Sequence, residues 1–298
     1  MISHNVLLGW AFSPYPTQWP PLVYICLVVT LIGLRATLSD TSGWRQLVRE
    51  LCLILPAVLL YFLVRGSVNA RQADAVANAK FLIQVERSFG IFVEQDWQAA
   101  ITKYPAAVTT MNWIYIWAHW PFVAVSAGWL WCRNRAAYRS LRTAILVSGA
   151  LGLILFALTP VAPPRLMPDA GFVDTVVNQS RSYRVLQPPA LTNIYAAFPS
   201  LHFGWNLLVG ITLVRHSGTR LGRSIGMICP VAMFMAIVLT ANHYILDGVA
   251  GGAIALVGYA VAQRTGHGSS SVADAKNLSR YPTRTTRQRK RTLVPTHE

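Results

Sequence analysis

Charged residues are scarce in this chain. Asp, Glu, Lys and Arg together make up 12% of the 298 residues, about half of the roughly 25% found in ordinary soluble proteins. Hydrophobic residues account for 53% of the chain, and ten Trp and eleven Tyr supply side chains for the headgroup region of a bilayer. The shortage of charge argues against an ordinary soluble protein and indicates a membrane protein.

Paired cysteines are also missing. The four cysteines, Cys26, Cys52, Cys132 and Cys229, lie in or at the edge of apolar runs and show no metal or redox spacing. We therefore expect no disulfide and no zinc site. Residues 1–10 hold no Lys or Arg, so the basic region of a secretory signal is absent and the first apolar run should remain as a span.

The net charge of +15 would suit a nucleic-acid partner, but much of it lies between Arg280 and Arg291, where apolar residues are few. A basic tail beside a membrane is better explained by orientation and by attraction to membrane lipids, so we expect no nucleic-acid partner. The composition predicts one transmembrane domain over 1–262 and a disordered basic cytoplasmic tail over 263–298.

Apolar runs long enough, or nearly so, to cross a hydrocarbon layer of roughly 30 Å occur at 22–38, 47–64, 108–131, 141–159, 199–214, 225–241 and 245–261. In lipid, spans of this length satisfy their backbone polar groups only as helices. We predict an all-α, polytopic membrane helix bundle with six to seven transmembrane helices.

Basic residues predict the orientation of this bundle. With the N-terminus outside, 18 of the 26 Lys and Arg residues fall on the inner side, and every inner connection is basic. The positive-inside rule then places the C-terminus in the cytoplasm. We expect the protein in the cell membrane.

Two outer segments are too long to be simple connections. Residues 66–107 contain an apolar stripe typical of one or two amphipathic helices, which could lie in the membrane interface or pack as a cap over the bundle. Residues 160–198 carry prolines at both ends, which disfavours an interior helix there.

Four ionisable residues near span ends fall on the same outer side. Arg165 follows the fourth span, His202 lies in the first turn of the fifth, His243 follows the sixth and Asp247 opens the seventh. Intramembrane ionisable groups cost about 2.5–3.5 kcal/mol each on insertion scales. A cluster of them at one surface therefore favours a functional site over separate structural roles.

Each of these residues has a chemical interpretation. His243 and Asp247 are four apart, so a helix would put them on one face, where the carboxylate can accept the Nδ1 proton and leave Nε2 as a nucleophile. Pro199 and Ser200 are helix-start signals, and the free N–H groups of a first turn bind anions. His202 is placed to move a proton, and Arg165 offers a planar fork for a phosphate. His119, which lies among tryptophans in the third span, we assign to packing and a kink.

The motifs Pro-Pro-Arg at 163–165, Phe-Pro-Ser-Leu-His at 198–202 and Asn-His-Tyr-Ile-Leu-Asp at 242–247 resemble the signatures of the phosphatidic acid phosphatase type 2 superfamily. They are most similar to the branch that contains inositol phosphorylceramide synthases. The resemblance is strong over 140–262, where we expect the catalytic core, and weaker from Asn78 to Gln98.

The resemblance implies a phosphohistidine on His243, with Asp247 as its orienting group and His202 as general acid and base. It implies phosphate binding by Arg165 and Ser200, and neither metal nor cofactor. Two cations of the commoner superfamily pattern are replaced here, one by Leu158 and one in the pair Ala236-Ile237. Arg184, and after it Arg181, are our candidates to replace them.

The motifs leave the reaction open. Water as acceptor gives a lipid phosphate phosphatase, whereas an alcohol such as inositol gives a phosphotransferase. A metal-dependent hydrolase using His202, His243 and Asp247 and a transporter with an ionisable pathway are the alternatives. A chelator would test the first, and flux without product would indicate the second.

Overall fold

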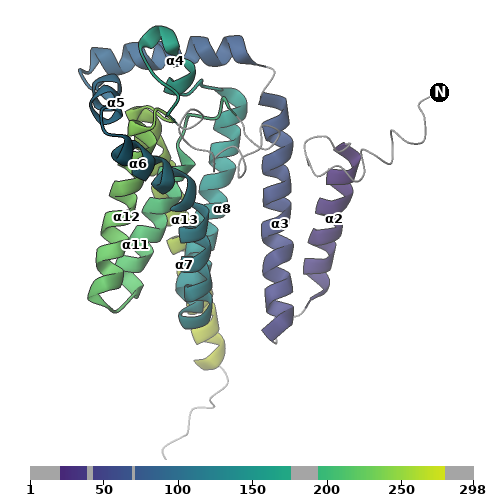
Figure 1. The fold of residues 1–298 in the computed structure, drawn as a ribbon. Helices are drawn as coiled ribbons and strands as arrows, with labels where there is room; N and C mark the ends of the chain where they lie inside the picture. The colour runs from purple at the N-terminus through teal and green to yellow at the C-terminus, as the bar shows by residue number, and fades with distance from the viewer. Residues whose placement is uncertain (1–20, 39–42, 69–70, 176–193, 279–298) are drawn as a thin grey trace, which may run out of the picture.

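The computed structural model describes residues 21–38, 43–68, 71–175 and 194–278 (Figure 1). Its elements are α2 (Pro21–Thr37), α3 (Gly43–Val68), α4 (Gln72–Ser88), α5 (Glu94–Thr102), α6 (Pro105–Trp117), α7 (Trp120–Arg133), α8 (Arg135–Leu158), η2 (Pro164–Leu166), η3 (Pro168–Ala170), α11 (Leu201–His216), α12 (Arg220–Leu239) and α13 (Ile245–Leu278). Over these ranges the backbone forms no strand, and one parallel bridge joins Val161 and Ala196. The all-α prediction is confirmed.

Three helices in the described part of the chain are long and apolar enough to cross a membrane. They are α8, α12 and the first part of α13, Ile245–Thr265. The apolar runs at 22–38, 47–64 and 199–214 correspond to α2, α3 and α11. The chain therefore has the character of a membrane protein, and the count of seven spans stays a prediction.

The predicted third span is not one helix. Helix α6 ends at Trp117 and α7 begins at Trp120, with His119 between them. Pro121 has no N–H to donate and so suits the first turn of a helix but not its interior. The apolar run at 108–131 therefore divides into two helices of 13 and 14 residues.

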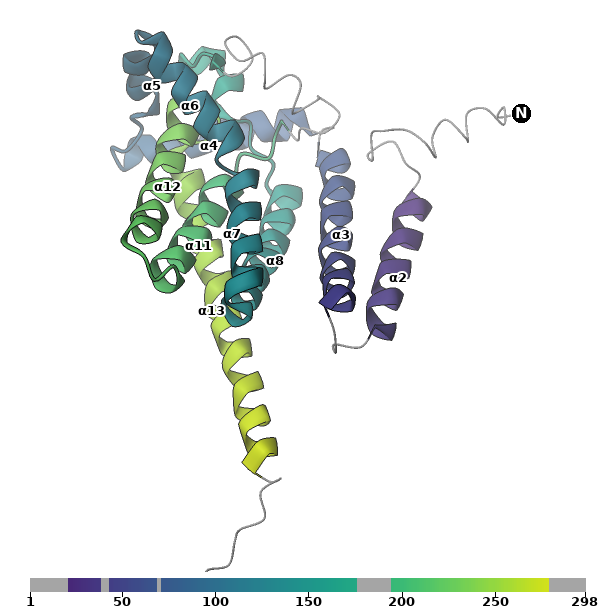
Figure 2. The same ribbon diagram turned by 60° about the horizontal axis from the view of Figure 1, so that its bottom comes forward.

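Basic residues gather at one end of the bundle. The end of α2, the start of α3, the α11–α12 connection and the far end of α13 all lie opposite to α4 and α5 (Figures 1 and 2). At this end Arg142 forms an ion pair with Glu50, which ties α8 to α3, and Arg35 donates to the Arg49 carbonyl. The arrangement agrees with the predicted clustering of positive charge.

Helix α4 lies across the other end of the bundle (Figure 1). It buries Ala75, Ala79 and Ile83 in a cluster with residues of the outer loop and of the α12–α13 turn. The Ala162 N–H donates to the Ala75 carbonyl at 3.0 Å. Of the two arrangements considered for residues 66–107, the packed cap fits these contacts.

Helix α13 runs to Leu278, although the sequence predicted disorder from residue 263. Residues 263–278 contain no proline, and extending an existing helix adds a hydrogen bond for each residue fixed. The rest of the predicted tail, 279–298, lies outside the described residues.

Candidate active site

Three connections meet at the capped end of the bundle. The Val161 N–H donates to the Tyr195 carbonyl at 2.9 Å, which pairs the segment after α8 with the segment before α11. The Arg165 N–H donates to the Ala241 carbonyl at 2.8 Å, which joins the same segment to the α12–α13 turn. These backbone bonds bring the residues that the sequence placed on one side into a single cluster.

His243 lies in a tight turn between α12 and α13. Its N–H donates to the Ile237 carbonyl at 3.0 Å, and the turn passes through a left-handed conformation at Ala241, with φ of 54°. The side chain is buried. Its Nδ1 lies 2.8 Å from the Ala197 carbonyl and 3.4 Å from Asp247 Oδ2. Both partners accept hydrogen bonds, so Nδ1 carries the proton and Nε2 keeps a lone pair.

Asp247 fixes the turn as well as the imidazole. Its carboxylate is fully buried, and Oδ2 accepts a hydrogen bond from the Tyr244 N–H at 2.9 Å. This is the contact by which an acidic side chain in the first turn closes back on the start of its own helix. The sequence predicted Asp247 as the acceptor of the His243 proton, but the Ala197 carbonyl is closer.

His202 faces His243 from the first turn of α11. The two ring centroids are 5.9 Å apart, with 52° between the ring planes. The His202 ring stacks on Tyr115 of α6 at 4.6 Å. A phosphoryl group between the two imidazoles would be within reach of both.

A third imidazole, His119, lies next to His202. Their ring centroids are 4.3 Å apart, and His119 is 3% exposed. Asn206 Nδ2 lies 3.3 Å from His119 Nδ1 and donates to the His202 carbonyl at 3.0 Å. Sequence reasoning gave His119 a packing role and so missed its place in the cluster. The sequence did contain one indication of a functional role, because His119 is an ionisable residue inside an apolar run.

Arg165 is held rigidly beside the His243 turn. Its Nε donates to Asn242 Oδ1 at 3.0 Å, and its guanidinium forms an ion pair with Asp174 at 3.0 Å. The side chain is 7% exposed. Asn242 in turn donates to Thr240 Oγ1 at 2.7 Å. A guanidinium oriented in this way presents its planar fork in a defined direction.

Ser200 precedes α11 and is fully buried. Its N–H donates to the Asp247 carbonyl at 2.8 Å, which links the start of α11 to the start of α13. No described group hydrogen-bonds its hydroxyl. A buried hydroxyl of this kind at a helix start fits a phosphate oxygen.

The positions where the resemblance expects two further cations hold apolar side chains. Leu158 is exposed at the end of α8, while Ala236 and Ile237 are buried between α12 and its neighbours. The predicted replacements, Arg184 and Arg181, lie outside the described residues. Arg165 is thus the cation that the described part of the structure brings to the His243 turn.

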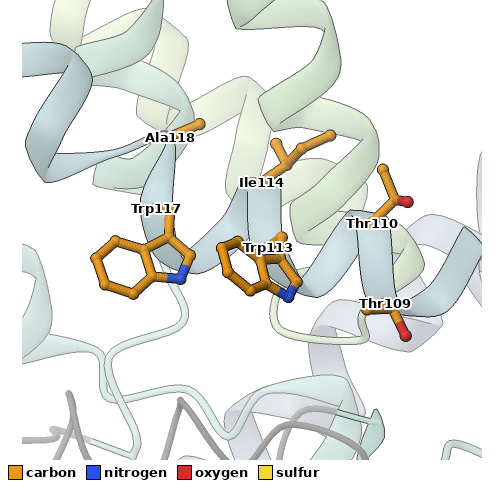
Figure 3. A pocket seen from close by; sticks show the side chains of 6 residues that line it. All are labelled: Thr109, Thr110, Trp113, Ile114, Trp117 and Ala118. Carbon is orange, nitrogen blue, oxygen red and sulfur yellow. The ribbon is translucent and has the colours of Figure 1, made fainter. Parts of the chain in front are cut away.

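The two faces of α6 have different surroundings. Tyr115 points to His202, while Trp113 and Trp117 stack at 5.9 Å on the other side. Figure 3 shows the two indoles along a shallow open pocket with Thr109 and Thr110 further along the helix. Both threonine hydroxyls bond to backbone carbonyls of their own helix. An apolar surface therefore runs along α6 towards the residues that precede His119.

Among the described residues, no group of three or more His, Cys, Asp and Glu side chains is arranged to hold a metal ion. A family model described as PAP2 superfamily matches residues 80–261, which is more than half of the chain. No curated protein gives a significant match, and no solved structure does.

Proposed function

The chain belongs to the PAP2 superfamily, and we propose that it is a membrane-embedded lipid phosphate phosphatase or phosphotransferase that works through a phosphohistidine. The main observation in support of this proposal is the hydrogen bonding of the His243 ring. Its Nδ1 is held by the Ala197 carbonyl at 2.8 Å, so that Nε2 is the free nucleophile. The His202 ring lies 5.9 Å away as a partner for proton transfer.

In the first step, His243 Nε2 attacks the phosphorus of the lipid phosphate. The P–N bond forms while the bond from phosphorus to the leaving oxygen breaks. Protonated His202 donates its proton to that oxygen. Arg165 and Ser200 hold the other phosphate oxygens, and Asp247 stabilises the charged imidazole that forms on His243.

In the second step, neutral His202 takes a proton from the acceptor hydroxyl, whose oxygen attacks the phosphorus. The P–N bond breaks and its electron pair returns to His243. Water as acceptor releases inorganic phosphate, whereas an alcohol yields a new phosphodiester if the transferred group retains one ester bond. The similarity of the three motifs to the inositol phosphorylceramide synthase branch favours an alcohol such as inositol.

We also propose the location of the reaction. The basic end of the bundle, opposite α4 and α5 (Figure 1), would face the cytoplasm by the positive-inside rule. The histidines would then act at the extracytoplasmic face of the cell membrane, with the N-terminus outside.

The test uses the purified full-length protein in detergent with a panel of lipid phosphates, with and without inositol. Free phosphate and new phosphodiester are measured separately, which distinguishes hydrolysis from transfer. With a ³²P-labelled lipid, an acid-labile, base-stable label is expected on the protein and is expected to vanish in His243→Ala. Normal turnover by His243→Ala would refute the covalent mechanism.

A further inference from the structure

Two glutamates from the cap satisfy the first turn of α13. The Ile245 N–H donates to Glu94 Oε1 at 2.8 Å, and the Leu246 N–H donates to Glu86 Oε1 at 2.9 Å. Both glutamates are fully buried. The N–H groups of a helix start have no partner within their own helix, so α5 and α4 supply the missing acceptors.

If all were ionised, these glutamates and Asp247 would place more negative charge around the start of α13 than the helix can balance. Asp247 accepts from the preceding N–H, that of Tyr244, so three buried carboxyl groups serve three consecutive N–H groups. The positive end of a helix corresponds to only about half an elementary charge. Three ionised carboxylates are therefore more than this turn can balance.

One proton on the two glutamates would reduce this negative charge, and the Oε2 atoms are the places where it can bind. Oε1 of each glutamate is engaged with backbone, while Oε2 of Glu86 and of Glu94 has no hydrogen-bond partner among the described groups. Burial, with the neighbouring Glu94 and the charge of Asp247 as further causes, raises the pKa of Glu86 from 4.5 to about 9. The titratable groups that face Glu86 are Glu94 from α5 and Asp247 and Tyr244 from the start of α13.

We propose that Glu86 and Glu94 share one proton and act as a positioning pair, which fixes the turn carrying His243 and releases it when the proton is lost at alkaline pH. The pair touches neither substrate nor the reacting atoms. It acts through the N–H groups of Ile245 and Leu246, which directly follow the His243-Tyr244 turn. Its effect on catalysis rests on the proposed function, whereas its effect on stability does not.

Loss of the shared proton has a defined structural result. A second negative charge then faces Asp247 in buried surroundings, and like charges at such distances repel strongly. The turn reduces this repulsion by moving away from α4 and α5, which hold it through Glu86 and Glu94. That movement changes the direction of the His243 ring, which is set by contacts to Ala197 and Asp247.

The test compares Glu86→Gln and Glu94→Gln with the wild-type protein over pH 6 to 10. An amide can accept from the backbone with its oxygen and donate to the remaining carboxylate with its NH₂, so each variant permanently mimics the protonated pair. In the wild-type protein, kcat and the melting temperature are both expected to fall as the pH rises towards about 9. In each Gln variant the alkaline fall should be lost or displaced, with kcat at pH 7 close to that of the wild type.

Two further variants separate positioning from general damage. Asp74→Asn removes an exposed acid from the same helix α4 and should leave both pH profiles unchanged. Glu86→Leu leaves the Leu246 N–H without an acceptor and should lower kcat by at least roughly tenfold.

The proposal is refuted if kcat and the melting temperature of both Gln variants still fall at alkaline pH as they do in the wild-type protein. It is also refuted if a folded Glu86→Gln protein is as inactive as Glu86→Leu. Should the wild-type protein turn over no lipid phosphate, the proposed function fails. The comparison of melting temperatures between the wild type and the Gln variants then still decides whether the shared proton exists.

Discussion

A methyl group at Gly251 should separate α11, which carries His202, from α13, which directly follows the His243 turn. A Cβ at this position would lie 2.0 Å from the Ser200 carbonyl oxygen and 2.7 Å from its carbon. Ordinary contact begins at 3.4 Å, so the starts of α11 and α13 must move apart by more than about 1 Å in a close-packed interior. The obstacle is backbone, which cannot rotate away as a side chain can.

The displacement acts directly on the proposed reaction. His202 belongs to α11, and His243 precedes α13. A misplacement of about 1 Å can cost roughly 10²-fold in rate, and overpacking a core typically costs about 1–3 kcal/mol of stability. Gly251→Ala is therefore expected to lower kcat by about two orders of magnitude while the protein still folds.

The assay measures phosphate release in detergent together with thermal unfolding. Gly128→Ala is the matched control, because Gly128 lies inside α7 with nothing within 4 Å of its added Cβ. That variant should keep wild-type activity and gain about 0.5–1 kcal/mol of helix stability. If Gly251→Ala folded and turned over substrate as fast as Gly128→Ala, the close approach of α11 and α13 would not be what sets the distance between the imidazoles.

Three further outcomes follow from the site. Arg165→Lys keeps the charge but cannot bridge Asn242 and Asp174 together, so kcat/KM should fall by roughly 10–100-fold for lipid phosphates, measured by steady-state kinetics. His119→Phe keeps a ring but leaves Asn206 without the imidazole nitrogen, a loss of about 1–3 kcal/mol for a buried polar group. Because Asn206 also bonds the His202 carbonyl, kcat should drop about tenfold while the melting temperature shifts by only a few degrees; an unchanged kcat would show that the contact between His119 and Asn206 does not position His202. Activity should persist after exhaustive treatment with a strong chelator, since no proposed step uses a metal. If the chelator abolished activity and added zinc restored it, the metal-dependent hydrolase would be favoured.

The gathering of the site residues was predictable because a helix in a membrane has only two ends. Counting apolar runs was enough to put Arg165, His202 and His243 at one surface, and the structure brings them together. Assigning span ends to one side of the membrane requires only the number of crossings, so errors in the predicted helix boundaries did not matter. The third run breaks at His119, yet its two halves together still cross from the capped end to the basic end (Figure 2).

Other parts of the site left weaker signals in the sequence. The closest acceptor for His243 is the carbonyl of Ala197, and any residue at that position offers the same group. Glu86 and Glu94 occur in segments whose other acids and bases are mostly exposed, so sequence alone could not separate buried acids from solvated ones. Ser200 and Asp247 were predictable because helix starts select such residues.

The contacts of α4 and α5 argue for a larger active-site unit than the three motifs alone predicted. A core over 140–262 would leave the N–H groups of Ile245 and Leu246 buried without Glu94 and Glu86 as acceptors, at about 1–3 kcal/mol each. It would also lose the bond from Asn78 to the Pro160 carbonyl at 2.8 Å, which anchors the segment leading to Arg165. The family match begins at residue 80, inside α4. By contrast, α2 packs on α3, which reaches the rest of the bundle through α8. The cap therefore supports the turn that carries His243 without touching the reacting atoms, and we propose that the folding unit needed for the site runs from α4 to α13.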